Sequence, residues 1–145
     1  MTGKFIDVNK ARSAEQLEQF QQIVDDGVCP FCPEHLEEYH QKPIIKRFEH
    51  WQLTENMIPY EGAFTHYLAI PLRHLVHIEE LNVPEWLDLK NVIDFSTSAM
   101  KYGGVALRFG NFEHTAASVA HLHLHIFEPL KRTDDEPQLK FKIST

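Results

Sequence analysis

The stretch VAHLHLHIF, residues 119–127, decides the fold. Histidine alternates there with apolar residues at a period of two, which predicts a β-strand with two different faces. His121, His123 and His125 share one face, and the apolar residues that alternate with them form a face that belongs in a core. Three neighbouring imidazoles would need partners for their polar nitrogens if they were buried. A solvent-exposed strand face would explain them without function, whereas phosphate chemistry and metal binding are the chemical explanations.

Outward from this strand, the hydrophobic pattern predicts an α+β fold. Ser13 and Gln16 have the spacing of a capping box and begin a helix over 13–25, and Asn82 caps a longer helix over 83–102. Short alternating segments predict strands over 43–48, 50–55, 64–71 and 105–110, and an edge strand over the tail 138–144. Strands on both sides of a long helix indicate a mainly antiparallel sheet of about five strands, with an additional helix at the N-terminus.

The composition limits the possible functions. The chain has 145 residues, with 14 Lys and Arg against 21 Asp and Glu, a net charge of −7, ten histidines and two cysteines. This length suits one domain without disulfide staples. The acidic balance argues against an extended nucleic-acid footprint, and no stretch predicts a signal peptide or a membrane-spanning helix. A reduced Cys-x-x-Cys as the only cysteine feature predicts a cytoplasmic protein.

Three motifs together resemble one known family. HLHLHIF (121–127) matches the His-x-His-x-His signature of the histidine triad (HIT) family of nucleotide hydrolases and transferases. FTHYLAIPLRHLVHIEEL (64–81) is similar to the family segment in which a histidine leads through a strand to Ile-Pro-x-x-His. CPFC (29–32) resembles the Cys-x-x-Cys of the zinc-containing branch. The chain is therefore identified as a member of this family over about residues 28–128.

The resemblance implies a domain division and a HIT-like fold. It places the HIT domain at 28–129, after an N-terminal helical extension over 1–27 and before a C-terminal tail over 130–145. It also implies a purine nucleoside phosphate as the substrate and a homodimer with the long helix at its interface. Packing of that helix on the protein's own sheet is the alternative use of its apolar residues.

The implied chemistry centres on His123. An imidazole nitrogen without its proton is a good nucleophile toward phosphorus near neutral pH. In the family the central triad histidine attacks the α-phosphate and forms a nucleotidyl-histidine, so the resemblance makes His123 the nucleophile. It places His125 and His66 beside the phosphate as further catalytic residues. The implied substrate-binding residues are Asn56 for the ribose and Asn111 and Ser118 for the phosphate.

The cysteines predict half of a metal site. Two thiolates at the spacing of Cys29 and Cys32 hold one zinc ion only with two further ligands. The resemblance implies His74 and His121 as those ligands, in a closed, structural Zn²⁺ site. From the residues alone, His35 is an alternative ligand. A redox Cys-x-x-Cys and a pair of buried, reduced cysteines are the alternatives to zinc.

The loop before the triad departs from the family. It reads NFEHTAASV (111–119), with Ala116-Ala117 where the family usually carries Gly-Gln, and that glutamine contributes to phosphate and leaving-group contacts. The sequence predicts a nucleotide hydrolase or nucleotidyl transferase acting on a phosphoramidate, a phosphate ester or a dinucleoside polyphosphate. A nucleotide-binding protein of low turnover is the second hypothesis. A hydrolase that uses His-x-His-x-His as an open metal site is the third.

Overall fold

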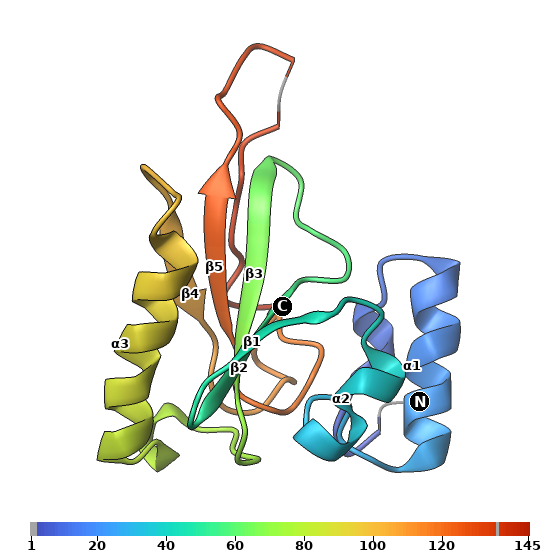
Figure 1. The fold of residues 1–145 in the computed structure, drawn as a ribbon. Coiled ribbons are helices and arrows are strands. Elements are labelled where there is room, and N and C mark those ends of the chain that lie inside the picture. Colours follow the sequence, from blue (N-terminus) through green and yellow to red (C-terminus); the bar gives the residue numbers. More distant parts are fainter. Residues whose placement is uncertain (1–2, 136) are drawn as a thin grey trace.

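A five-stranded antiparallel sheet forms the centre of the computed structural model, which describes residues 3–135 and 137–145 (Figure 1). The strand order is β1-β2-β3-β5-β4. The strands are β1 (Ile44–Arg47), β2 (Trp51–Glu55), β3 (Ala63–Pro71), β4 (Gly104–Leu107) and β5 (Leu124–Pro129). The helices are η1 (Val8–Lys10), α1 (Ala14–Asp26), α2 (Pro33–Tyr39), η2 (Ile78–Glu80) and α3 (Val83–Thr97). The predicted α+β fold, with a five-stranded antiparallel sheet, a long helix and an additional N-terminal helix, is confirmed.

The two faces of the sheet have different surroundings. Alternate residues of β3 point to opposite sides, so Tyr67 pairs with Ile126 on one side and Leu68 pairs with His125 on the other. The first side carries the main core, to which β2, β3, β5 and α3 contribute Trp51, Leu53, Ala69, Leu124, Ile126, Leu89 and Val92. The second side is covered by α2, with α1 beyond it (Figure 1). His66 and His125 therefore lie on the face away from α3.

Helix α1 forms where its predicted caps lie. Ser13 Oγ accepts a hydrogen bond of 3.0 Å from the amide of Gln16, and Gly27 ends the helix with a φ of 68°. The Gln16 side chain does not complete the capping box, because its Oε1 accepts from the Arg12 amide at 2.6 Å instead. Helix α3 likewise begins at its predicted cap, Asn82.

The prediction that the second helix runs to residue 102 is wrong, since α3 ends at Thr97. Three consecutive hydroxyl residues at this end donate back to the backbone: Ser96 to Val92 O, Thr97 to Ile93 O and Ser98 to Phe95 O. Such side-chain bonds compete with the helical ladder and weaken the last turn. At 15 residues α3 is short, and no helix in the described ranges is long and apolar enough to cross a membrane.

The triad stretch is a strand only in its second half, so the strand predicted over 119–127 is wrong at its start. β5 begins at Leu124, and His121 and His123 lie before it. The first half of the stretch bonds instead to the N-terminal segment and to the loop after β3, and this bends it away from the sheet. The predicted alternation persists, because the residues between the histidines are buried in the core on the α3 side. These are Leu122, Leu124 and Ile126.

The predicted edge strand over 138–144 is also wrong. The tail turns back after β5 and passes Gly62, where a Cβ atom would lie 2.7 Å from the carbonyl oxygen of Pro137. It then lies against the loop before the triad, where the Ala116 amide donates to Ile143 O at 2.9 Å. Because its neighbour is this loop and not a sheet edge, the tail makes only an isolated bridge.

Candidate functional site

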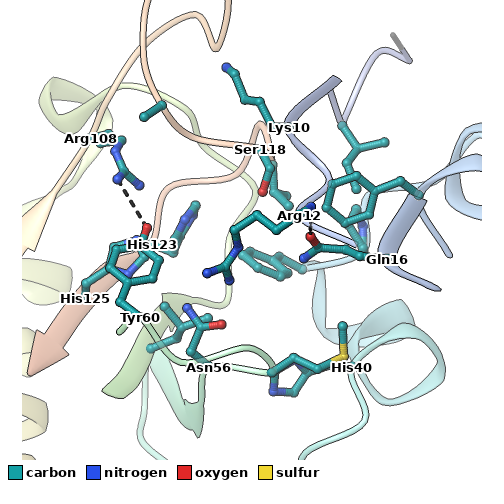
Figure 2. A pocket seen from close by; sticks show the side chains of 18 of the residues that line it. Lys10, Arg12, Gln16, His40, Asn56, Tyr60, Arg108, Ser118, His123 and His125 are labelled. Atoms are coloured by element: carbon teal, nitrogen blue, oxygen red, sulfur yellow. Dashed lines mark hydrogen bonds between the residues drawn. The ribbon is translucent and has the colours of Figure 1, made fainter. Parts of the chain in front are cut away.

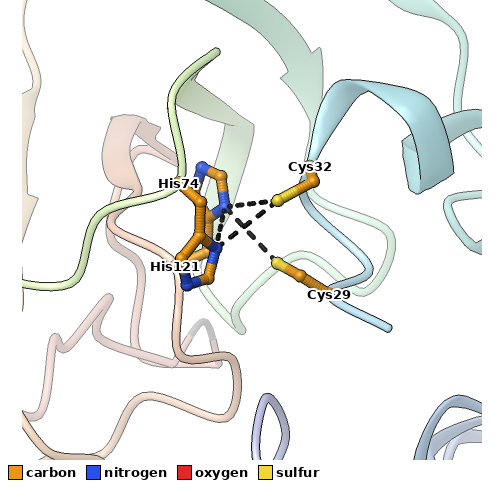
Figure 3. A group of neighbouring side chains, drawn as sticks. All are labelled: Cys29, Cys32, His74 and His121. Carbon is orange, nitrogen blue, oxygen red and sulfur yellow. Dashed lines mark hydrogen bonds between the residues drawn. The ribbon is translucent and has the colours of Figure 1, made fainter. Parts of the chain in front are cut away.

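Four side chains converge from three separate parts of the chain (Figure 3). Cys29 and Cys32 lie between α1 and α2, His74 follows β3 and His121 precedes β5. Their ligand atoms all lie within 4.8 Å of one another. Nδ1 of His121 is 3.4 Å from Cys29 Sγ, and Nδ1 of His74 is 3.4 Å from Cys32 Sγ. The four residues form a possible metal site, which includes His74 and not the alternative ligand His35.

The spacing of these atoms fits a small tetrahedral ion. Around one Zn²⁺ ion, a sulfur and a nitrogen ligand stand about 3.6 Å apart and two nitrogens about 3.3 Å apart. Nδ1 of His74 and Nδ1 of His121 are 3.2 Å apart, and Cys32 Sγ lies 3.7 Å from His121 Nδ1. His121 donates from Nε2 to the Pro71 carbonyl at 2.9 Å, so its Nδ1 carries no proton and can bind a metal.

Burial changes the protonation of Cys29, Cys32 and His121. Burial raises the pKa of Cys29, and burial together with the neighbouring Cys29 raises the pKa of Cys32 to about 12. Burial lowers the pKa of His121 to about 4, so its ring is neutral at pH 7. A divalent cation would favour the thiolate forms, and two sulfurs with two imidazole nitrogens are a donor set that binds zinc.

A second histidine cluster lies on the sheet face away from α3. His66 of β3 and His125 of β5 are on adjacent strands, and Nε2 of His66 lies 2.8 Å from Nδ1 of His125. The Tyr60 amide donates to His66 Nδ1 at 3.2 Å, which leaves the His66 proton on Nε2 for the bond to His125. His125 then carries its own proton on Nε2. That atom is buried and has no hydrogen-bond partner among the described residues.

His123 has the opposite arrangement of its two nitrogens. Its Nδ1 donates to the carbonyl oxygen of His121 at 2.7 Å, so Nε2 is the nitrogen with the free lone pair. Burial lowers the pKa of His123 to about 4, and burial followed by the charge of Arg12 lowers the pKa of His66 to about 3. Burial also holds the pKa of His125 well below its usual range. All three rings are therefore neutral at pH 7.

The second cluster opens into a cavity of about 460 Å³ (Figure 2). The predicted site residues that line it are His123, His125, Ser118 and Asn56. His66 lies behind them, and its Nε2 is 3.2 Å from the side-chain nitrogen of Asn56. Asn111 is exposed and lies outside the lining, where its Oδ1 accepts from a backbone amide of its own loop. The structure thus brings together all of the predicted catalytic and substrate-binding residues except Asn111.

The triad is divided between the two sites. His121 belongs to the possible metal site, which we call the metal group (Cys29, Cys32, His74 and His121). His123 and His125 line the cavity. Within the described ranges, the group around Cys29 and Cys32 is the only one that could hold a metal ion. The alternating histidines therefore do not form one open site of three imidazoles.

Positive charge gathers in the same cavity, which the motifs did not indicate. The cationic side chains in the lining are Lys10, Arg12, Arg108, Lys140 and Lys142. Among the described residues, the lining carboxylate is that of Glu61. Lys140 and Lys142 come from the tail. Their spacing of two residues in an extended segment places both side chains on one side, and this was the sequence feature that could have indicated a cationic face. In a chain of net charge −7, this concentration of cations gives the cavity a local positive charge that would attract an anion.

A family model covers most of the chain. The model described as "Scavenger mRNA decapping enzyme C-term binding" matches residues 28–137. The chain belongs to this family. Many solved structures of histidine triad proteins share its fold, so the histidine triad assignment made from the sequence is confirmed. No curated protein matches the chain.

The solved structures that resemble this histidine triad protein are distant in sequence. A HIT family hydrolase from Clostridium thermocellum is 21% identical with a TM-score of 0.56, covering 77% of this chain and 96% of that one. A Zn-bound histidine triad family protein from Mycobacterium smegmatis is 21% identical with a TM-score of 0.54, covering 75% and 79%. Diadenosine triphosphate hydrolase from Plasmodium falciparum is 20% identical with a TM-score of 0.52, over 66% of this chain. This chain spans 65% of that enzyme's length, and such similarity shows the fold alone.

In this histidine triad protein both ends of the chain hold the loop before the triad. The Lys10 ammonium donates to three carbonyl oxygens of the loop, those of Phe112, Thr115 and Ala117, the last two at 2.6 and 2.8 Å. The tail lies against the other side of the loop, through the bond from the Ala116 amide. The loop that lacks the family glycine and glutamine is therefore held in place by residues outside the family motifs.

Proposed function

We propose that this histidine triad protein is a nucleotide hydrolase or nucleotidyl transferase that acts at the α-phosphate of its substrate. The observation that carries the proposal is the pairing, in one cavity, of the unprotonated Nε2 of His123 with the N–H of His125. A nucleophile and an unsatisfied donor side by side are what phosphoryl transfer requires. The substrate is a nucleoside phosphoramidate, a phosphate ester or a dinucleoside polyphosphate.

His123 forms and breaks the bond to phosphorus. Its Nε2 lone pair attacks the α-phosphorus, an N–P bond forms, and the bond to the leaving group breaks with its electron pair going to the leaving atom. The Nδ1–H bond to the His121 carbonyl stabilises the positive charge that the ring acquires in this step. Water or another acceptor then attacks phosphorus and the N–P bond breaks with its electron pair returning to Nε2, so the ring is neutral again. The proton lost by the attacking water passes to solvent.

The neighbouring side chains hold the phosphate for this attack. The unpartnered N–H of His125 donates to a non-bridging oxygen, and the Ser118 hydroxyl makes a second such contact. His66 acts through His125, because its bond of 2.8 Å fixes the orientation and tautomer of that ring. Asn56 contacts the ribose. A phosphate contact by Asn111 stays a prediction that requires its loop to move, since its side chain lies outside the cavity lining.

We also infer that a structural Zn²⁺ ion binds Cys29, Cys32, His74 and His121. The four donors saturate a tetrahedral ion, so the metal would cross-link the chain and would not present an open position to a substrate. It would tie the segment before α2 to the start of the triad. This cross-link would keep His123, two residues after His121, in place beside the cavity.

The remaining parts of the proposal concern the base, the assembly and the location. Aromatic side chains of Phe20, Phe31 and Tyr39 line the cavity and suit a purine.

A homodimer would cover the exposed apolar residues of α3, where Val83 and Leu87 are 69% and 66% exposed. The reduced cysteines support a cytoplasmic protein. Light scattering of wild type and Leu87→Lys tests the dimer, which the substitution should dissociate.

The test of the reaction is direct. The protein is incubated with adenosine 5′-phosphoramidate or with a dinucleoside polyphosphate, and AMP is measured. Acid-labile radiolabel from an α-³²P substrate should be trapped on wild type and be absent from His123→Asn. His50→Asn is the matched control, because His50 lies in the turn before β2, outside the cavity lining, and its side chain lies 3.7 Å from a carboxylate oxygen of the exposed Glu49. Absence of both AMP and trapped label from wild type would reject the enzymatic proposal.

A nucleotide-binding protein of low turnover is the second candidate. The observation that favours it is Ala117, which stands where the family glutamine would contact the phosphate and the leaving group. Tight AMP binding without turnover would support this candidate. Restoring the glutamine, as Ala117→Gln, should then raise the rate of AMP formation.

A further inference from the structure

Arg108 is a buried cation beside the triad. Strand β4 runs antiparallel to β5, and Ala106 of β4 lies opposite His125. Continued past the ends of the two strands, this register sets Arg108 opposite His123, on the sheet face that carries His125. The side chain of Arg108 lines the cavity and is only 9% exposed. After burial, its charge is one of the causes that lower the pKa of His125, so the two groups lie near each other.

The contacts of Arg108 orient its charge without neutralising it. Its Nε donates to Lys142 O at 2.6 Å and its Nη2 donates to the Tyr60 hydroxyl at 3.2 Å. The guanidinium also lies 4.0 Å from the centre of the Phe141 ring. It forms no ion pair with a carboxylate in the described ranges. A buried guanidinium without a counter-charge is costly, and an anion in the cavity would remove that cost.

Arg108 and Tyr60 both keep hydrogen-bond donors for a ligand. Of the three guanidinium nitrogens of Arg108, Nη1 has no partner among the described residues and is not fully buried. The Tyr60 oxygen accepts from Arg108, so the hydroxyl proton of Tyr60 points elsewhere, and residues 3–135 and 137–145 offer it no acceptor. Figure 2 shows this bond next to His123 and His125, where the attacked phosphate would lie.

We propose that Arg108 and Tyr60 are catalytic residues, whose guanidinium and hydroxyl groups donate to the non-bridging oxygens of the attacked phosphate. This inference rests on the proposed function and adds two residues from outside the sequence motifs to its site. The loop before the triad carries Ala117, whose methyl group donates no hydrogen bond. The donors come instead from the end of β4 and from the segment between β2 and β3.

Both groups act on the phosphate in the first step of the reaction. The N–P bond forms between Nε2 of His123 and phosphorus, and the bond to the leaving atom breaks with its electron pair on that atom. Arg108 and Tyr60 keep their protons throughout. They donate hydrogen bonds to oxygens that carry negative charge in the transition state. Because Lys142 O and the Phe141 ring already hold the guanidinium, it does not have to reorient when the charge develops.

The first experiment measures turnover of adenosine 5′-phosphoramidate. Tyr60→Phe removes one hydroxyl and retains the ring, whose centroid lies 4.6 Å from that of His66. It should lower kcat/KM about tenfold. Arg108→Gln should lower kcat/KM about 10³-fold, with at most about tenfold of the loss in KM, because the contact strengthens in the transition state. Arg108→Lys keeps the charge without the planar fork and should recover part of the rate.

Exposed residues of the same types provide the matched controls. Tyr102 is 60% exposed, Arg47 is exposed on β1 and pairs with Glu37, and both lie outside the cavity lining. Tyr102→Phe and Arg47→Gln should keep the wild-type kcat/KM. Wild-type kinetics in Tyr60→Phe would overturn the role of the hydroxyl, and wild-type kinetics in Arg108→Gln would overturn that of the guanidinium. Melting curves check folding, and Arg108→Lys replaces Arg108→Gln if the latter does not fold.

The second experiment measures binding and does not depend on turnover. Calorimetry gives Kd for adenosine and for AMP, and the ratio of the two isolates the contribution of the phosphate. This ratio should fall about tenfold in Arg108→Gln and about threefold in Tyr60→Phe, and it should be unchanged in the controls. An unchanged ratio in both cavity variants would overturn the inference. If wild type releases AMP from no substrate while the ratio falls in these variants, the proposed reaction fails but the phosphate contacts stand.

Discussion

The two histidine clusters of this protein differ in whether their polar atoms are satisfied. In the metal group, the ligand atoms of Cys29, Cys32, His74 and His121 face one another, and the second nitrogen of His121 is bonded to Pro71 O. In the cavity, a chain of bonds runs from the Tyr60 amide through His66 to His125 and ends on a buried N–H, for which residues 3–135 and 137–145 offer no partner. Histidine therefore faces other possible metal ligands in the first cluster, whereas in the second it ends on a donor that has no partner among the described residues.

The comparison is sharpest between His121 and His123, which are two residues apart. One bond links them, because Nδ1 of His123 donates to the backbone carbonyl of His121. The imidazole of His121 points to the thiols, whereas that of His123 lines the cavity. If the interpretation is correct, substitutions at these two positions should separate stability from activity.

The largest effect is expected from His123→Asn. Loss of the nucleophile should lower kcat by at least about 10⁴-fold, because Nε2 of His123 forms the N–P bond in the proposed reaction. The midpoint of thermal unfolding should change little, since the asparagine amide can still donate to His121 O. Kinetics and a melting curve on the same sample measure both quantities. A variant that keeps its rate, or that loses stability as much as His121→Asn, would remove the distinction between the clusters.

Breaking the metal group should have the converse effect. His121→Asn and Cys29→Ser should each lose the metal and lower the free energy of unfolding by about 3–5 kcal/mol. Elemental analysis of protein purified without a histidine tag should find one zinc per wild-type chain and none in the variants. Denaturant titration gives the stability. At temperatures where the chelated protein is still folded, turnover should persist, and an immediate loss of activity on chelation would contradict a purely structural metal.

Motif spacing and resemblance predicted two sets of residues, and the structure brings the four residues of the possible metal site together and places His123 and His125 in the lining of the cavity. The alternation of Leu122, Leu124 and Ile126 with the histidines also predicted the buried face correctly, although residues before Leu124 are not a strand. That error has a physical cause. Periodicity reports which side chains are buried, whereas a strand also requires a neighbouring backbone, and here the neighbours are loops.

The cations of the cavity could not be predicted in the same way. Lys10 and Arg12 lie near one end of the chain and Lys140 and Lys142 near the other, so only the folded structure brings them to the same loop and cavity. No local rule of helix or strand periodicity reports contacts over such separations. The end of α3 was missed for the opposite reason, since it depends on local hydroxyl bonds that compete with the helix.

The next effect is a pH dependence that belongs to the cavity cluster. Because burial lowers the pKa of His66 to about 3, the unfolded chain binds a proton at this residue below pH 6.5 and the folded protein does not. Stability from this group is therefore complete above pH 6.5 and is lost as the pH falls toward 3. Between pH 6.5 and 5, wild type should lose about 2 kcal/mol more than His66→Gln. Urea titrations at both pH values measure the difference, and proton-driven metal loss affects both proteins alike. Parallel losses in the two proteins would show that His66 titrates normally.

The smallest expected effect tests whether turnover at the cavity depends on the order of the loop before the triad. In the proposed zinc site the four ligands would be held by the metal, whereas the loop before the triad is held by Lys10 from the N-terminal segment. Lys10→Met removes three charge-assisted bonds and leaves three carbonyls to water, so amides over 111–120 should exchange faster with deuterium. We expect kcat/KM to fall about tenfold, equivalent to about 1.4 kcal/mol, as the loop and its Ser118 become less ordered.

The control for this test is Lys90→Met, because Lys90 is exposed on α3, away from the loop, and pairs with Asp94 of the same helix at 2.6 Å. Lys10→Arg should recover part of the rate, since a guanidinium can donate to several of the same carbonyls. Zinc content should be equal in all three variants, because no ligand of the metal group touches this loop through a side chain. If Lys10→Met exchanges and turns over like Lys90→Met, the loop is ordered by the tail alone. The order of the cavity would then not depend on Lys10. The proposed difference between the two clusters would rest only on the N–H of His125, which has no hydrogen-bond partner among the described residues.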